Sequence, residues 1–172
     1  MSDAVVDLVI EDVRWADVLP ELAGIAECAA EMALSILPEN ARNCEICVMA
    51  CDDARIADLN RQFRDKAGAT NVLSWPAFEL GAEHAGEVPR VPSRSGGLNA
   101  RLFLGDVAIA LETVVAEANE TSKPLKNHVL HLILHGSLHL LGYDHETPED
   151  AALMEGIEKR LLAAEGLPDP YV

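Results

Sequence analysis

The sequence has no apolar run long enough to cross a membrane, since no stretch approaches the roughly 20 consecutive apolar residues of a spanning helix. Residues 1–4 also lack the start of a secretory signal peptide, which begins with basic and then apolar residues. We therefore expect a cytoplasmic protein with no membrane partner. Its 172 residues, 49% of them hydrophobic, suffice for one sizeable core and not for two. This predicts a single domain over residues 1–172.

Cysteines are few, and none of the four belongs to a complete metal or redox motif. Cys44 and Cys47 have C-x-x-C spacing, but the chain offers no second pair to finish a zinc site. Residues 44–51 have the pattern of a strand, which would place Cys47 and Cys51 on one face and Cys44 on the other. We interpret these residues, and Cys28, as reduced thiols that pack in the interior.

Basic residues are also scarce, with 13 Lys and Arg against 29 Asp and Glu, for a net charge of −16. Such a charge opposes long-range capture of nucleic acid. Residues 55–101 nevertheless hold seven of the basic side chains against five acidic ones, a local charge of +2. A small RNA contact is compatible with this region, and a scatter of solvated surface charges is the alternative.

The hydrophobic pattern predicts strands at 5–10, 44–51, 70–75 and 102–109, and helices at 15–37, 52–63, 110–119, 124–140 and 148–165. Asp52 or Asp53 can cap the second of these helices, and Thr121 or Ser122 the fourth. Residues 79–100 are rich in Gly, Pro and Ser, so we expect a mobile loop there.

Five of the six histidines lie between residues 128 and 145, and three of them have the spacing of metal ligands. His135 and His139 are four residues apart on a predicted helix, so both project from one face. Gly142 can adopt a positive φ and turn the chain sharply, which allows His145 to fold back over the helix end. We therefore predict a metal centre formed by His135, His139 and His145.

Three neutral imidazoles without an evident fourth side chain favour an open, water-bearing zinc ion over a closed structural one. Asp144 is the alternative fourth ligand, and nickel or copper would also suit three imidazoles. The same offsets occur in metzincin peptidases, H-E-x-x-H-x-x-G-x-x-H, but Gly136 stands where those enzymes place their general base. His128 and His131, earlier on the helix, either support the ligands or are polar residues at its exposed start.

Residues 135–145 resemble the H-G-x-L-H-L-x-G-Y-D-H signature of the YbeY family, bacterial endoribonucleases of ribosomal RNA maturation. The segment 59–64 is similar to that family's L-N-x-x-Y-R segment, with Phe63 in place of tyrosine. Further similarity covers nearly the whole chain, through residues 70–76, 104–109 and 169–171.

The resemblance implies an α+β fold, with a mixed sheet of about four strands packed by helices around a zincin-like metal cleft. It implies that His135, His139 and His145 hold one zinc ion and that Arg64 is the family's functionally important arginine. The implied activity is zinc-dependent endonucleolytic cleavage of single-stranded RNA in ribosomal RNA processing, notably 16S 3′ end maturation, and in ribosome quality control. Ribosomal RNA and the ribosome or its small subunit are then the expected partners.

The expected mechanism combines zinc, which lowers the pKa of bound water, with Arg64, whose guanidinium can hydrogen-bond the phosphorane. Asp144 and Tyr143 are the nearest candidates for a general base, and the sequence does not choose between them. A metallopeptidase and a ribosome assembly factor with structural zinc are the alternative functions. The sequence makes no prediction of oligomeric state.

Overall fold

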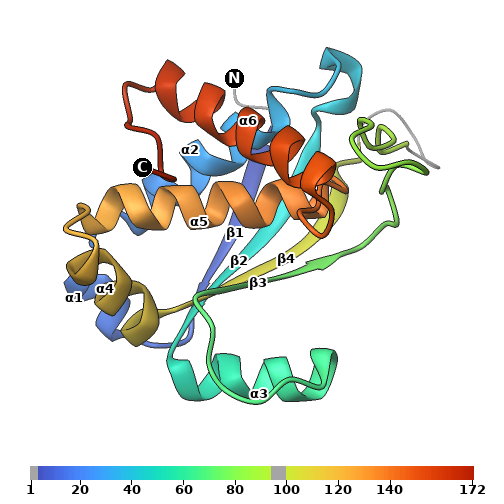
Figure 1. The fold of residues 1–172 in the computed structure, drawn as a ribbon. Coiled ribbons are helices and arrows are strands. Elements are labelled where there is room, and N and C mark those ends of the chain that lie inside the picture. Colours follow the sequence, from blue (N-terminus) through green and yellow to red (C-terminus); the bar gives the residue numbers. More distant parts are fainter. Residues whose placement is uncertain (1–3, 94–99) are drawn as a thin grey trace.

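The structure, a computed structural model, describes residues 4–93 and 100–172, and a four-stranded mixed sheet forms its centre (Figure 1). The strands lie in the order β1-β2-β4-β3 and comprise β1 (Ala4–Ile10), β2 (Cys44–Cys51), β3 (Val72–Pro76) and β4 (Leu102–Ala110). β1, β2 and β4 are parallel, while β3 runs antiparallel to β4 along one edge. The predicted α+β fold with a mixed sheet of about four strands is confirmed.

Helices cover both faces of this sheet, as Figure 1 shows. The helical segments are α1 (Arg14–Val18), α2 (Leu22–Leu34), a 3-10 turn (Glu39–Ala41), α3 (Asp53–Arg64), α4 (Leu111–Glu120), α5 (Leu125–Leu140) and α6 (Pro148–Ala164). α2, α5 and α6 lie on one side of the sheet, and α3 lies on the other. Consecutive residues of β4 divide between the two sides, because Val107 belongs to the core under α5 and Ala108 packs with Ile56 and Leu59 of α3.

The sequence prediction of one helix over residues 15–37 is wrong, because the chain breaks after α1 and restarts as α2. Pro20 explains the break: it has no N–H to donate, and its ring disfavours helical geometry in the residue before it. Leu19 accordingly has a φ of −143° and a ψ of 75°.

Of the two predicted N-caps, that of α3 is confirmed and that of α5 is wrong. Asp52 is the N-cap of α3 and accepts a hydrogen bond from the Arg55 backbone N–H at 2.7 Å, as predicted. Neither Thr121 nor Ser122 caps α5, whose N-cap is Pro124. The Thr121 hydroxyl instead donates to the Glu117 carbonyl at the end of α4.

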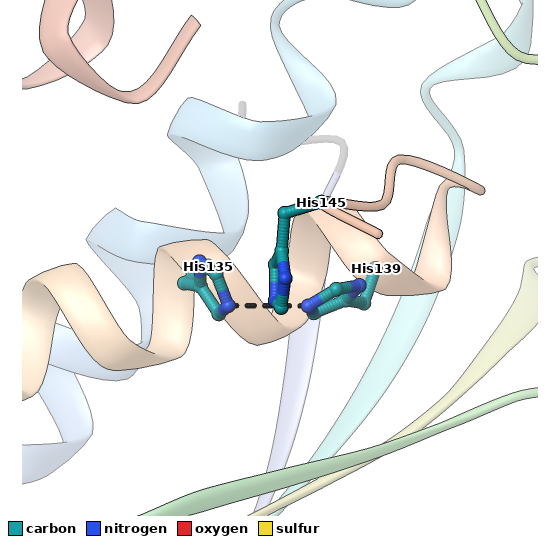
Figure 2. A group of neighbouring side chains, drawn as sticks. All are labelled: His135, His139 and His145. Atoms are coloured by element: carbon teal, nitrogen blue, oxygen red, sulfur yellow. Dashed lines mark hydrogen bonds between the residues drawn. The ribbon is translucent and has the colours of Figure 1, made fainter. Parts of the chain in front are cut away.

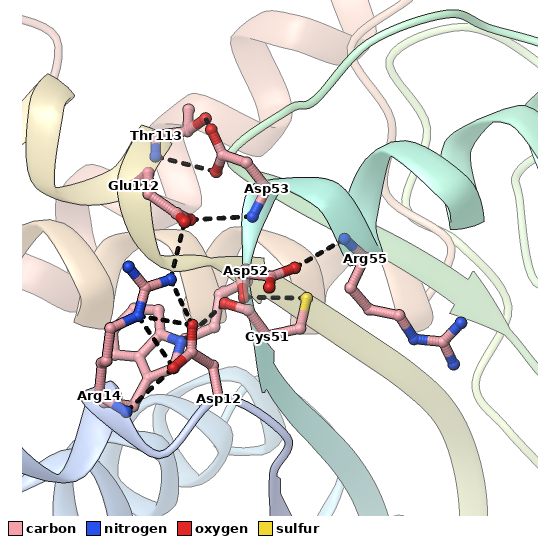
Figure 3. A network of polar contacts seen from close by, with 10 residues as sticks. Asp12, Arg14, Cys51, Asp52, Asp53, Arg55, Glu112 and Thr113 are labelled. Atoms are coloured by element: carbon pink, nitrogen blue, oxygen red, sulfur yellow. Dashed lines mark hydrogen bonds and ion pairs between the residues drawn. The ribbon is translucent and has the colours of Figure 1, made fainter.

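A strand-end network joins α1, α3 and α4 where the parallel strands end, and it consists of Asp12, Arg14, Asp53, Glu112 and Thr113 (Figure 3). The Arg14 guanidinium donates to Asp12 at 2.5 Å and to Glu112 at 2.7 Å. Glu112 accepts from the Asp53 backbone N–H, and Asp53 accepts from the backbone N–H and hydroxyl of Thr113. A hollow of about 370 Å³ beside this network is lined by residues 11–14, 51, 52 and 55, none of which is a histidine.

The segment predicted as a loop has neither helix nor strand in its described part, 79–93 and 100, whereas residues 94–99 lie outside the described residues. Gly86 donates its backbone N–H to Asp150 at 2.8 Å, and the Arg90 N–H donates to the Leu80 carbonyl. None of the four cysteines, all of which lie in the described ranges, forms a disulfide, in agreement with the prediction of reduced thiols. Within the described ranges, no helix has both the length and the apolar character that spanning a membrane requires.

Candidate metal centre

The apolar residues of α5 pack into the core, which leaves a stripe of three histidines, His131, His135 and His139, on another side of the helix. Ile133, Leu134, Leu138 and Leu140 are fully buried. His131, His135 and His139, spaced by one helical turn, are only partly buried. The helix is therefore fixed in rotation by the core, and the imidazoles of His135 and His139 project from the same side, as predicted.

The turn after α5 depends on Gly142, which has a φ of +95°. A Cβ atom at this position would lie 2.8 Å from the Leu80 side chain, so a larger residue would be both strained and crowded. Beyond the turn, Asp144 accepts a hydrogen bond from the His145 backbone N–H at 2.7 Å. The reversed chain brings His145 back over the end of the helix, as Figure 2 shows.

The three rings converge on one point. The Nε2 atoms of His135 and His139 are 3.1 Å apart, and the ring centroid of His145 lies 5.3 Å and 5.0 Å from those of His135 and His139. The three residues offer ligand atoms that all lie within 4.8 Å of one another. The structure thus brings together the three histidines that the sequence singled out.

The hydrogen bonds on the far side of the rings determine which nitrogen carries the proton. His139 Nδ1 lies 2.9 Å from the Tyr143 carbonyl, and His135 Nδ1 lies 2.9 Å from a carboxylate oxygen of Glu158. Because both partners are acceptors, each Nδ1 must be the donor, and each neutral ring has its lone pair on Nε2. Two lone pairs 3.1 Å apart repel each other, whereas a cation beside them would be bound by both. The donor set therefore fits a metal ion.

The pKa values support a neutral His139 imidazole and an ionised Glu158 carboxylate. Burial, followed by the neighbouring His135 and His145, lowers the pKa of His139 to about 4, so this ring is neutral at pH 7. Burial alone would raise the pKa of Glu158, but hydrogen bonds from His131 and His135 offset it and bring the pKa down to about 2. Glu158 is therefore an ionised acceptor.

Asp144 and Tyr143, the candidates for a fourth ligand and a general base, do not direct their side chains to the point where the three imidazoles converge. Asp144 is exposed, its carboxylate bonds the His145 backbone, and it is not among the three residues that form the group. Burial raises the pKa of the Tyr143 phenol above its ordinary value of 10, which disfavours the phenolate at neutral pH. Tyr143 contributes its backbone carbonyl to His139 instead.

Gly136 faces the sheet and not the cluster. A Cβ atom at this position would lie 2.8 Å from the Val107 side chain and 3.1 Å from the Ser74 hydroxyl oxygen. That hydroxyl donates to the Gly136 carbonyl at 3.2 Å, so β3, β4 and α5 are in close contact here. A glutamate at 136 would have no space, which removes the structural basis for a metzincin-type peptidase.

Arg64 is the last residue of α3 and is exposed, on the opposite side of the sheet from α5 (Figure 1). Its guanidinium forms no hydrogen bond or ion pair with any of the residues that the structure describes. The neighbouring Phe63 is 63% exposed, and its ring meets that of Trp75 edge-on at a centroid distance of 5.9 Å. The structure does not join Arg64 to the histidines by a direct contact, and its role remains a prediction.

Sequence reasoning missed Glu158 and gave Tyr171 no role, although both reach the histidine stripe. Glu158 is fully buried and receives hydrogen bonds from His131, His135 and Tyr171. The available signal was an acidic residue among the buried positions Met154, Ile157 and Leu162 of one helix. His131 is therefore not a polar residue of an exposed helix start.

The comparisons with known proteins agree with one another. The family described as Endoribonuclease YbeY matches residues 17–166. Endoribonuclease YbeY of Ruegeria pomeroyi is 50% identical over 96% of each chain, and that of Cereibacter sphaeroides is 49% identical over 98% of this chain and 99% of its own. The solution structure of TM1509 from Thermotoga maritima has a TM-score of 0.52 at 18% identity, and the match covers 94% and 92% of the two chains. This last likeness concerns the fold alone.

Proposed function

The chain belongs to the YbeY endoribonuclease family, and from this premise we propose that it is a zinc-dependent, single-strand-specific endoribonuclease of ribosomal RNA processing. The maturation of the 16S 3′ end and ribosome quality control are the proposed settings, with the small subunit or the ribosome as partner. The observation that supports the metal dependence most strongly is the convergence of His135, His139 and His145.

The three histidines would hold one zinc ion, and the cluster has no fourth protein ligand among the described residues. When bound by three neutral imidazoles, zinc supplies Lewis-acid catalysis, which activates water or polarises a phosphoryl oxygen. The protein's own contribution is orientation: the Tyr143 carbonyl and the Glu158 carboxylate hold the His139 and His135 rings by their Nδ1 atoms.

RNA binding is assigned to the end of α3. Arg64 can donate two parallel hydrogen bonds to a phosphate, and its guanidinium has no competing partner among the described side chains. An unpaired base can stack on the exposed ring of Phe63, next to Arg64, whereas a paired base is already stacked within its helix. This arrangement supports a preference for single strands.

The opposite positions of α3 and α5 constrain the path of the RNA. Arg64 and the histidines lie on different sides of the sheet (Figure 1). The edge strand β3 contacts both helices, since Ser74 bonds the Gly136 carbonyl of α5 and Trp75 meets the Phe63 ring of α3. An RNA strand that contacts both must therefore pass around the β3 edge. A substrate shorter than this path would reach the metal without reaching Arg64, so the effect of Arg64 substitution should grow with substrate length.

The test is cleavage of single-stranded RNA oligonucleotides of increasing length by the wild type, His139→Ala and Arg64→Ala, with bound zinc measured in each. We expect the wild type to bind one zinc ion and to cleave. A chelator should stop cleavage while the domain stays folded, which separates catalytic from structural zinc. A chelator that melts the domain would favour the alternative of an assembly factor with structural zinc.

A further inference from the structure

Glu158 is a charged side chain placed where a soluble domain normally has an apolar one. It projects from α6, has no exposed surface, and lies in the same buried stripe as Met154, Ile157 and Leu162. Burying a carboxylate is costly unless it is well hydrogen-bonded. The placement therefore calls for a reason beyond packing.

Glu158 meets three donors at once. One carboxylate oxygen accepts from His135 Nδ1 at 2.9 Å, and the other accepts from His131 Nε2 and from the Tyr171 hydroxyl, the latter at 2.8 Å. Each of these contacts orients its partner, because a carboxylate can only accept. The bond to His135 is the one that reaches the metal centre, since it leaves the lone pair of His135 on Nε2.

The C-terminal segment, residues 169–172, places Tyr171 beside this carboxylate. The Lys123 ammonium, just before α5, donates to the Pro170 carbonyl at 2.6 Å. The Tyr171 ring packs edge-on against His131 at a centroid distance of 5.6 Å, and the Lys159 ammonium lies 5.5 Å from the ring centroid. The C-terminal segment is thus fixed across α5 and α6 behind the histidines.

We propose that Glu158 is a positioning residue that fixes His135 for metal binding, and that the C-terminal segment strengthens metal binding by holding Glu158 through Tyr171. The proposal deepens the proposed function and depends on its metal centre. Carboxylates that hold metal-bound imidazoles typically contribute about 10- to 100-fold to metal affinity. Tyr171, one step further from the ion, should contribute less than Glu158.

A second ion is the competing explanation, because His131, His135 and Glu158 also lie close enough together to hold one. The contacts favour hydrogen bonds. The His135–Glu158 distance of 2.9 Å is typical of a charge-assisted hydrogen bond, and the Tyr171 hydroxyl occupies the same carboxylate oxygen that His131 contacts. Counting the ions bound per chain decides between the two explanations.

The test uses the full chain freed of metal and measures zinc affinity by competition with a chromogenic chelator, and the visible spectrum after cobalt substitution. The variants are Tyr171→Phe, which removes only the hydroxyl, and Glu158→Gln, which removes the charge. Glu117→Gln is the matched control, because Glu117 of α4 pairs at 2.8 Å with His128, a histidine of α5 that contacts neither Glu158 nor Tyr171.

We expect zinc affinity to fall about 10- to 100-fold in Glu158→Gln and about 3- to 10-fold in Tyr171→Phe, and to stay unchanged in Glu117→Gln. The cobalt spectrum should shift in the first two variants, while the melting temperature of metal-free Tyr171→Phe stays close to that of the wild type. Zinc binding in Tyr171→Phe equal to the wild type would overturn the role of the C-terminal segment. If soluble Glu158→Gln also bound zinc normally, the positioning role would fall with it.

Two further outcomes separate this inference from the proposed function. Two zinc ions per wild-type chain, with one lost in Glu158→Gln, would make Glu158 a ligand and overturn the positioning role. A wild type that binds no zinc would contradict the proposed function itself.

Discussion

The histidine cluster and the strand-end network are both dense groups of polar side chains, yet their atoms are arranged in opposite ways. In the strand-end network the carboxylate oxygens accept hydrogen bonds from donors within the network. The Arg14 guanidinium, for example, donates to both Asp12 and Glu112 (Figure 3). In the histidine cluster the Nε2 atoms of His135 and His139 face each other at 3.1 Å (Figure 2), and both are acceptors when the two Nδ1 atoms donate to Glu158 and to the Tyr143 carbonyl. The first arrangement is complete without a ligand, whereas the second becomes favourable only with a cation.

This difference teaches how a site is distinguished from a structural network when both contain charged residues. Pairing of donors with acceptors stabilises the fold and leaves little to offer a ligand. In the histidine cluster the acceptor nitrogens converge, and other groups hold the rings by their Nδ1 atoms. This arrangement keeps the nitrogens free to bind a cation, although they repel one another when no cation is bound. Substitutions in the two regions should therefore affect different measurements.

The largest effect is expected for His139→Ala, which removes one of the three imidazoles. Zinc should be lost, and RNA cleavage should fall by about 1000-fold or more, because the metal contributes several kcal/mol to transition-state stabilisation. Zinc content and the single-turnover rate are the measurements. His128→Ala, on the same helix and outside the cluster, should keep its zinc. Stoichiometric zinc in His139→Ala would show that the ligand assignment is wrong.

Arg64→Ala should reduce cleavage of a long single-stranded RNA by about 10- to 100-fold, because a phosphate of the bound strand away from the metal loses its charged hydrogen-bond donor. Zinc content should not change. Arg61→Ala is the control, since Arg61 lies in the same helical turn but pairs with Asp58 at 3.2 Å. Equal rates for Arg64→Ala and the wild type would exclude the proposed phosphate contact.

Phe63→Ala should weaken binding of single-stranded RNA by about tenfold, since stacking of a base on an aromatic ring contributes roughly 1–3 kcal/mol. Binding of double-stranded RNA should change little. Phe103→Ala serves as the control because Phe103 is also an exposed aromatic residue, at 43%. An equal loss of affinity for both forms of RNA would contradict stacking as the origin of strand preference.

Asp53→Ala should leave zinc binding unchanged and lower the free energy of unfolding by about 1 kcal/mol, because the Thr113 backbone N–H at the start of α4 loses its carboxylate acceptor. Chemical denaturation of the metal-free protein measures this change. A loss of zinc affinity in Asp53→Ala would show that the two regions are coupled and would weaken the comparison.

The smallest effect is expected from the acid titration of Asp12. Hydrogen bonds from Arg14 lower the pKa of Asp12 below its ordinary value of 3.8. The pair therefore stabilises the fold at pH values above 3.8, and this contribution is lost as the pH falls through the lowered pKa. The difference in melting temperature between the wild type and Asp12→Asn should shrink as the pH is lowered from 6 towards 3. A difference that grows instead would have the wrong sign.

The sequence predicted those parts of the fold and site that depend on local spacing. The four-residue interval of His135 and His139 and the turn at Gly142 are local, and all three residues lie as predicted. The helix break also has a local signal, because Pro20 interrupts the apolar periodicity of residues 15–37.

Contacts between distant segments were not predictable in this way. Glu158 is 23 residues from His135, and the two meet only because α6 packs beside α5. Tyr171 is 13 residues beyond Glu158 and reaches it through the path of the C-terminal segment. Neither interval matches the period of a helix or a strand, so the sequence of one chain does not indicate that His135 contacts Glu158 or that Glu158 contacts Tyr171. The distribution of Arg64 and the histidines over two sides of the sheet likewise depends on topology.

The most direct measurement is a crystal structure of the zinc-loaded protein with anomalous data at the zinc absorption edge. We expect one peak equidistant from the imidazoles of His135, His139 and His145, with a remaining coordination position open to solvent. A peak elsewhere, or a zinc ion enclosed by four protein side chains, would contradict the proposal of a catalytic metal centre.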